Sequence, residues 1–225
     1  RDGSFGLWSS SNSSEEWLTA YATDFLVRAK EAGFRVPEGL YRNALNWLRW
    51  GVRVGFYSSD EIRPAAYAHY VLARAGKGDI GKLRHFFDTY KEVFPSPMEA
   101  AFVASALASY GDIERAQQAR RAVFKEWPDP PSDYYSSSDR RTAAILHLTA
   151  EAGLKGNELD ALAFRFAEKL ATRNHFSTQE SAWISMAALS IEEWAGNYQV
   201  EANGQLWQGP DPTRVKLGPS KLKQG

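Results

Sequence analysis

Apolar residues recur at helical spacing along most of this chain. The first helix predicted from this pattern lies between Ser14 and Gly33, and one face of it collects the apolar side chains of Trp17, Leu18, Tyr21, Phe25 and Leu26. Ser13 or Ser14 is expected to cap its start and Gly33 its end. The pattern is typical of a helix that buries one face.

The same periodicity predicts eight further helices, separated by Gly, Pro and capping Asp or Ser residues. They cover Glu38–Val52, Ala65–Ala75, Ile80–Phe94, Met98–Tyr110, Ile113–Trp127, Asp139–Ala152, Asn157–Thr172 and Thr178–Gly196. Pro64 is expected in the first turn of the third helix, where a missing amide proton costs nothing. Ser177 and Glu180 form a capping-box pattern at the start of the last one.

The predicted helices fall into two alternating sets. Five are small and aromatic, such as AAFVASALASY, and four are longer and more charged, such as IERAQQARRAVF. Their starts recur at roughly 35 to 47 residues, the period of a two-helix repeat. We therefore predict an all-α fold, an α/α toroid of alternating inner and outer helices, rather than an open solenoid with one regular repeat length.

Six inner helices close such a ring, so we expect its first three helices to lie before Arg1. The incomplete toroid is predicted to occupy residues 1–196. From Asn197 the helical period is lost and Gly and Pro become frequent, which favours a linker or the start of a following β domain over residues 197–225.

Composition excludes several classes of function. Lys plus Arg and Asp plus Glu both number 27, so the formal net charge is +0, and no basic run suggests a nucleic-acid partner. Cys is absent, which excludes disulfides, thiol catalysis and Cys-ligated metal within these residues. No apolar run is long enough for a membrane span, so we expect no membrane insertion by this segment. No metal or other cofactor is expected.

Three short motifs, two near the start of the helical region and one near its end, carry a family resemblance. The run from Asp2 to Trp8 is DGSFGLW, Trp17 to Tyr21 follows as WLTAY, and Phe176 to Glu180 is FSTQE. Together they resemble the thioester-containing domain of the α2-macroglobulin and complement family, and most closely that of bacterial α2-macroglobulins. The resemblance covers Arg1 to about Gly196.

The resemblance implies a broad-spectrum protease inhibitor. Family members hold a thioester between the Cys and Gln of a C-x-E-Q motif, and after a protease cleaves a bait region the thioester acylates the attacker. With no Cys here, we expect no catalytic residue in this chain and the thioester Cys and Gln upstream of it. Target proteases and other domains of the same parent protein are the implied partners, and the periplasm is the implied location, with any inner-membrane anchor in another part of the parent.

Loops that precede inner helices share one face of the ring, and this face is expected to lie near the thioester. The candidate residues on it are Trp8, Tyr57, Tyr134, Tyr135 and His175. These aromatic rings could shield a thioester from water or simply close the end of the ring. Some family members assist hydroxyl acylation with a His in the loop that corresponds to Gly51–Arg63, and this loop has none, so the resemblance implies a preference for amines.

The remaining polar candidates have structural explanations. His69 and His147 lie among apolar neighbours, which predicts packing or structural hydrogen bonds, and His85 is expected to face solvent.

An α/α-toroid enzyme, either a glycoside hydrolase or a prenyltransferase or cyclase, is one alternative function. Its candidate carboxylates are those of Asp133, Asp139 and Glu180, each of which also fits a first-turn or capping role. A thioester-free relative that traps proteases sterically is the other alternative.

Overall fold

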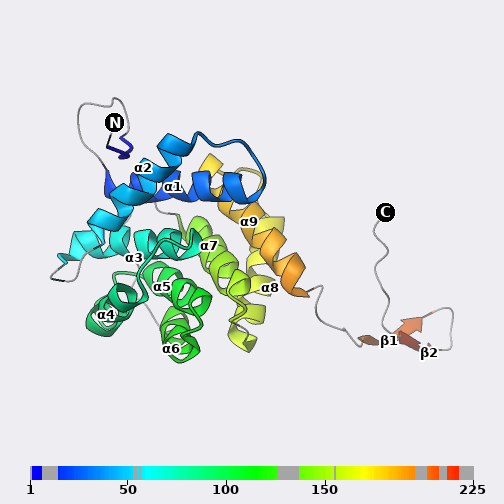
Figure 1. The fold of residues 1–225 in the computed structure, drawn as a ribbon. Helices are drawn as coiled ribbons and strands as arrows, with labels where there is room; N and C mark the ends of the chain where they lie inside the picture. The colour runs from blue at the N-terminus through cyan, green and yellow to red at the C-terminus, as the bar shows by residue number, and fades with distance from the viewer. Residues whose placement is uncertain are drawn as a thin grey trace.

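The computed structural model describes residues 2–6, 15–52, 55, 57–125, 137–154, 156–195, 202–207 and 212–217 (Figure 1). Within them the helices are α1 (Glu16–Glu31), α2 (Glu38–Gly51), α3 (Ser59–Arg74), α4 (Ile80–Tyr90), α5 (Pro97–Ser109), α6 (Ile113–Val123), α7 (Ser138–Glu151), α8 (Asn157–Ala171) and α9 (Thr178–Ala195). Two strands follow, β1 (Ala202–Trp207) and β2 (Pro212–Leu217). The predicted all-α class is confirmed for the region up to Ala195.

The odd-numbered helices form the inner layer. Along the chain, α1 packs on α3, α3 on α5, α5 on α7 and α7 on α9, while α2, α4, α6 and α8 lie outside them (Figure 1). Burial differs accordingly, because α5 is buried continuously from Met98 to Leu107 whereas α8 has only Leu159 and Phe166 as fully buried residues. This alternation is consistent with the predicted α/α toroid, and closure of the ring remains a prediction.

Aromatic rings fill the middle of the inner layer. Tyr67 of α3 stacks on Phe102 of α5 with ring centroids 4.2 Å apart, and Phe102 meets Trp183 of α9 edge-on at 6.4 Å. All three side chains are at most 1% exposed. Burial of this much aromatic surface contributes several kcal/mol to stability, and it leaves the space between the inner helices occupied by side chains.

Side-chain contacts show that the inner helices run parallel. Residues near the starts of α7 and α9 are bonded to each other, as Arg140 is to Gln179, and residues later in both helices are also bonded, as His147 is to Ser190. Trp17, near the start of α1, lies under the Arg140 guanidinium. The starts of α1, α7 and α9 therefore share one end of the inner layer, which we call the N-terminal end.

Three predicted boundaries were wrong. Helix α3 begins at Ser59, six residues before Ala65, because Ser58 and Glu61 form a capping box, with Glu61 Oε2 accepting from the Ser58 amide at 2.8 Å. Pro64 consequently lies inside the helix, and the preceding loop is shorter than 51–63. Helices α4 and α6 end four residues before Phe94 and Trp127 respectively.

The start of α1 also differs from the prediction. Its N-cap is Glu15, whose side chain makes no capping hydrogen bond, and Ser13 and Ser14 lie outside the described residues. The amide of Glu15 instead donates to the Phe5 carbonyl at 3.1 Å. A backbone contact from the preceding segment therefore takes part in holding this helix end.

The two strands pair antiparallel, with Ala202 opposite Leu217 and Trp207 opposite Pro212. The division of the chain at residue 196 remains a prediction. Across the described residues, no helix combines the length and the hydropathy that a bilayer crossing needs.

Candidate functional site

The first described residues, 2–6, dock onto α1 and α2. The amide of Phe5 donates to Thr19 Oγ1 at 3.0 Å, and the Thr19 hydroxyl also lies 3.3 Å from the Phe5 carbonyl. Gly3 has a φ of +106°, and a Cβ there would lie 2.1 Å from the Asn43 carbonyl oxygen. Only glycine fits this approach, so the Gly-aromatic motif serves to seat the segment against two helices.

A cluster of charged residues joins α7, α8 and α9 at the N-terminal end of the inner layer. The carboxylate of Asp139 is bonded to both Lys169 and Arg173, and Arg173 Nη1 also lies 3.4 Å from Glu180 Oε1. Burial alone would raise the pKa of Asp139, but the hydrogen bonds from Lys169 and Arg173 hold it below the usual range. This carboxylate is therefore ionised and paired at neutral pH.

Glu180 has the capping role that its motif predicts. Its Oε2 accepts from the Ser177 amide at 2.8 Å, and its own amide donates to Ser177 Oγ at 3.2 Å. The hydrogen bond from the Ser177 amide is the main cause that lowers the pKa of Glu180 to about 2. A general acid needs a raised pKa, so neither Glu180 nor Asp139 suits that task.

Arg140 links the two ends of the helical region. Its Nη1 donates to Gln179 Oε1 at 2.9 Å, and its guanidinium carbon lies 5.3 Å from the centroid of a Trp17 ring. The residue is 7% exposed, so the cation–π contact is largely desolvated and correspondingly strong. One side chain of α7 thus contacts both the WLTAY segment of α1 and the STQ turn of α9.

The structure describes two of the five residues predicted for the thioester face. Tyr57 is 3% exposed, with its ring edge-on to Phe86 and Tyr90, and its amide donates to the Tyr90 hydroxyl at 2.9 Å. His175 is exposed, and its carbonyl accepts from Arg173 Nη2 at 3.0 Å. Trp8, Tyr134 and Tyr135 lie outside the described residues, as does Asp133.

A second polar cluster lies near the other end of the inner layer, where α1, α3 and α7 approach their C-termini. Tyr70 is its junction: the hydroxyl donates to Glu151 Oε2 at 2.9 Å and accepts from Arg28 Nη2 at 2.7 Å. Arg74 joins it at 3.2 Å and is bonded to Glu151 as well. Burial would raise the pKa of Glu151, but His147 and Arg74 hold this pKa below its usual value.

Asp24 extends this cluster into the core. One carboxylate oxygen accepts from Arg28 Nε at 2.9 Å and the other from the Tyr67 hydroxyl at 2.9 Å. Burial raises the pKa of Asp24 despite the neighbouring Arg28. We missed this cluster in the sequence, where the only local sign is the spacing of Asp24 and Arg28 by four residues, because the tyrosines come from another helix.

The two buried histidines have the structural environment that was predicted. His147 Nδ1 lies 2.7 Å from Ser190 Oγ, and burial followed by the positive charge of Arg28 lowers the pKa of His147 to about 4. His69 packs beside Phe86 with ring centroids 4.9 Å apart. His85 is exposed on α4, as expected. No group of His, Asp and Glu suited to a metal ion occurs among the described residues.

Comparison with known proteins gives consistent matches from sequence and structure. The chain is 30% identical over 215 residues to the Alpha-2-macroglobulin of Escherichia coli (strain K12), covering 90% of this chain and 13% of that protein. It is 30% identical over 240 aligned positions to the Alpha-2-macroglobulin of Xylella fastidiosa (strain Temecula1 / ATCC 700964), covering 98% of this chain and 14% of the relative. The chain thus spans a small part of the length of these relatives. No family model matches it.

Solved structures agree with the sequence matches. A crystal structure of Salmonella alpha-2-macroglobulin reacted with methylamine superposes with a TM-score of 0.73 at 27% identity, over 96% of this chain and 14% of that one. A crystal structure of trypsin-activated alpha-2-macroglobulin from Escherichia coli gives a TM-score of 0.74 at 26% identity, over 96% of this chain and 15% of that one.

Proposed function

This chain is homologous to a region of the bacterial alpha-2-macroglobulins, and from that premise we propose that it is part of a protease inhibitor that traps attacking proteases covalently. The reacting thioester would lie outside the chain, since the chain contains no Cys. In this proposal the described helices form the scaffold against which the thioester segment packs. The family resemblance alone supports a periplasmic location for the inhibitor.

The observation that carries the proposal is the contact of Arg140 with two of the three resemblance motifs. Trp17 belongs to the WLTAY segment and Gln179 to the STQ turn, and Arg140 meets both at the N-terminal end of the inner layer. Thr19, also in WLTAY, holds the DGSFG segment at the same end. The three motifs therefore gather in one place, which is the arrangement that a common structural role requires.

The proposed chemistry is acyl transfer. An amine of the protease attacks the thioester carbonyl, the carbon–sulfur bond breaks, and the Cys thiolate leaves while an amide forms. The chain's own contribution is to position the strained segment and to limit access of water to it. Target proteases and further domains of the same protein are the partners that this proposal requires.

The toroid-enzyme alternative has less support. Its described candidate carboxylates, those of Asp139 and Glu180, both have lowered pKa values and both contact Arg173. Glycoside hydrolysis instead requires one carboxylic acid with a raised pKa. The rings of Tyr67, Phe102 and Trp183 also occupy the middle of the inner layer, where such enzymes need an open cavity.

The test is to incubate the intact protein with trypsin, with and without methylamine pretreatment, and to search for a conjugate that resists reducing agent and denaturant. We expect a conjugate that methylamine abolishes, because methylamine consumes the thioester first. Blocked proteolysis without a conjugate would replace covalent trapping by steric trapping. Loss of both would overturn the inhibitor proposal.

A further inference from the structure

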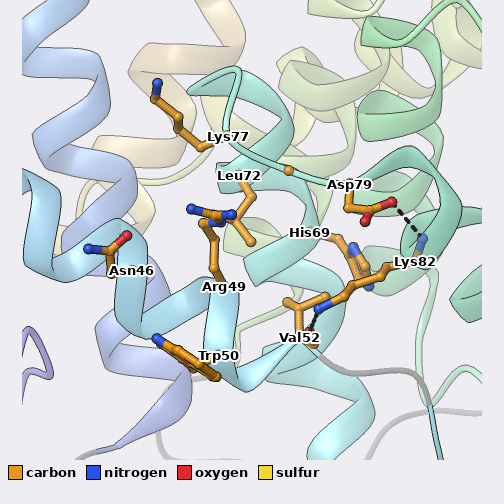
Figure 2. A pocket seen from close by; sticks show the side chains of 10 residues that line it. Asn46, Arg49, Trp50, Val52, His69, Leu72, Lys77, Asp79 and Lys82 are labelled. Atoms are coloured by element: carbon orange, nitrogen blue, oxygen red, sulfur yellow. Dashed lines mark hydrogen bonds between the residues drawn. The ribbon is translucent and has the colours of Figure 1, made fainter.

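A basic pocket of about 570 Å³ lies between α2, the C-terminal part of α3 and the start of α4 (Figure 2). Its lining includes the cationic side chains of Arg49, Lys77 and Lys82, together with His69 and the indole of Trp50. These residues come from three helices and the turn between α3 and α4.

The charges of this pocket are not balanced within it. Arg49 and Lys77 form no ion pair with any residue that the structure describes, and Lys82 Nζ donates to the Val52 carbonyl at 2.8 Å, which leaves further ammonium protons available. The lining contains one carboxylate, that of Asp79, whose Oδ1 already accepts from the amide of Gly81 at 2.8 Å. The pocket is therefore suited to an anion.

His69 adds a buried group with unused hydrogen-bonding capacity. It is 4% exposed, and its Nε2 has no hydrogen-bond partner. Burial, and then the charge of Lys82, lower the pKa of His69 to about 3, so the ring is neutral at pH 7. A buried polar atom without a partner costs about 1–3 kcal/mol, so the pocket wall carries a polar group that the described residues leave unsatisfied.

Trp50 separates this pocket from a second one of opposite charge. The indole is 87% exposed and borders a pocket of about 620 Å³ whose lining includes Asp2 and Glu16. Large aromatic side chains beside charged groups are the residues that contribute most to protein interfaces. A free inorganic anion would leave the indole in water, whereas a polypeptide would cover it.

We propose that this surface, formed by Arg49, Lys77, Lys82, His69 and Trp50, binds an extended acidic polypeptide segment. A carboxylate of that segment enters among the three cations, and an apolar neighbour lies on Trp50. This binding site is independent of protease trapping. Charge complementarity and the exposed indole both favour such an occupant over a small anion.

The test measures fluorescence anisotropy of a labelled peptide, Gly-Ser-Asp-Glu-Leu-Glu-Gly-Ser, with the intact protein at low ionic strength. The comparison peptide carries Asn and Gln in place of the acids. We expect the acidic peptide to bind at least ~10-fold more tightly than the amide peptide, and the R49Q/K77Q variant to lose ~10-fold in affinity. The matched control is R42Q/R121Q, which removes two exposed cations outside the pocket and should bind as the unmodified protein does.

A W50A variant and inorganic phosphate distinguish a polypeptide site from a small-anion site. We expect W50A to weaken peptide binding ~10-fold, because the apolar contact is lost, and millimolar phosphate to compete only weakly. Full displacement by phosphate with no effect of W50A would mean a small-anion site and would overturn the proposal. So would the absence of peptide binding, or equal affinity in the R49Q/K77Q variant.

Discussion

The hydroxyl of Tyr67 makes one contact whose loss can be measured alone. It donates to Asp24 Oδ2 at 2.9 Å, and the residue is 0% exposed. Burial raises the pKa of Tyr67 well above its ordinary value, so the hydroxyl remains a protonated donor at neutral pH. In Tyr67→Phe the ring that stacks on Phe102 at 4.2 Å is retained. The substitution therefore removes one hydrogen bond and little packing.

The expected cost follows from the ion pair of the acceptor, because the Arg28 guanidinium, 2.9 Å from Asp24, opposes the burial that raises the pKa of this carboxyl. A hydrogen bond to an ionised group contributes about 1.5–3 kcal/mol, and Arg28 still bonds the other Asp24 oxygen, so the loss should not exceed that range. Such a change in the free energy of local opening accelerates amide exchange by roughly 10- to 150-fold. The effect should concentrate in α1 and α3, which carry the two partners.

Hydrogen–deuterium exchange of α1 and α3 peptides in the intact protein measures this opening directly. The control is Tyr41→Phe, which removes a hydroxyl from a half-buried ring whose face contacts Lys30 Nζ at 4.2 Å and keeps that contact. We expect the control to change exchange by less than about twofold. Equal exchange in the Tyr67→Phe and Tyr41→Phe variants would refute the assignment of a charge-assisted bond to Asp24.

Three other predictions follow from the described geometry and the resemblance. Gly3→Ala should release the segment 2–6, because the new Cβ would lie 2.1 Å from the Asn43 carbonyl oxygen at a φ of +106°. The substitution should weaken docking of this segment by ~1–3 kcal/mol. Limited proteolysis should therefore cut the segment faster. Glu180→Gln should make the stability of the fold less sensitive to acid. The pKa of Glu180 is about 2 in the fold against an ordinary value of 4.5, so ionised Glu180 stabilises the fold above pH 4.5 and loses that contribution as the pH falls toward 2. Melting temperatures measured across this pH range test the prediction. With no His in the loop 52–58 before α3, activated intact protein should acylate an amine faster than glycerol, as rate comparison by mass spectrometry will show.

Each of these predictions has a contrary outcome. Gly33→Ala is the matched control for Gly3→Ala, because Gly33 also has a positive φ, of +81°, yet a Cβ there meets nothing within 4 Å. Equal proteolysis of the two variants would contradict the close-approach argument. An unchanged acid profile in Glu180→Gln would mean that the Ser177 cap does not depend on ionisation, and glycerol transfer as fast as amine transfer would contradict the inferred preference.

Local sequence patterns were sufficient for the helices and their alternation. Ala-rich α5 has no charged side chain after Glu99, and such a segment can be stable only if surrounded on all sides, which its burial confirms. Boundaries were less predictable where two local signals compete. Before α3, the helix begins at the Ser58 and Glu61 capping box and continues through Pro64, so the capping signal and not the proline marks its start.

The candidate site was only partly predictable from sequence. Glu180 and Ser177 were found because the capping box is local, whereas the role of Arg140 depends on Trp17 and Gln179, which lie far from it in the chain. Tyr57 was expected at the thioester face because its loop precedes an inner helix, and such loops share one face of the predicted ring. The structure places its side chain in the core beside Phe86, and its relation to a thioester remains a prediction.

The sequence by itself determined which segments are helical, which helices are inner, and which family the motifs resemble, since these depend on periodicity and on residues close together in the chain. Tertiary structure alone decided the polar clusters. Tyr67 reaches Asp24 across 43 residues and Tyr70 reaches Glu151 across 81. The basic pocket likewise combines α2, α3 and α4. Charges separated in sequence act together only when packing brings them close, because the Coulomb energy falls with the distance between them.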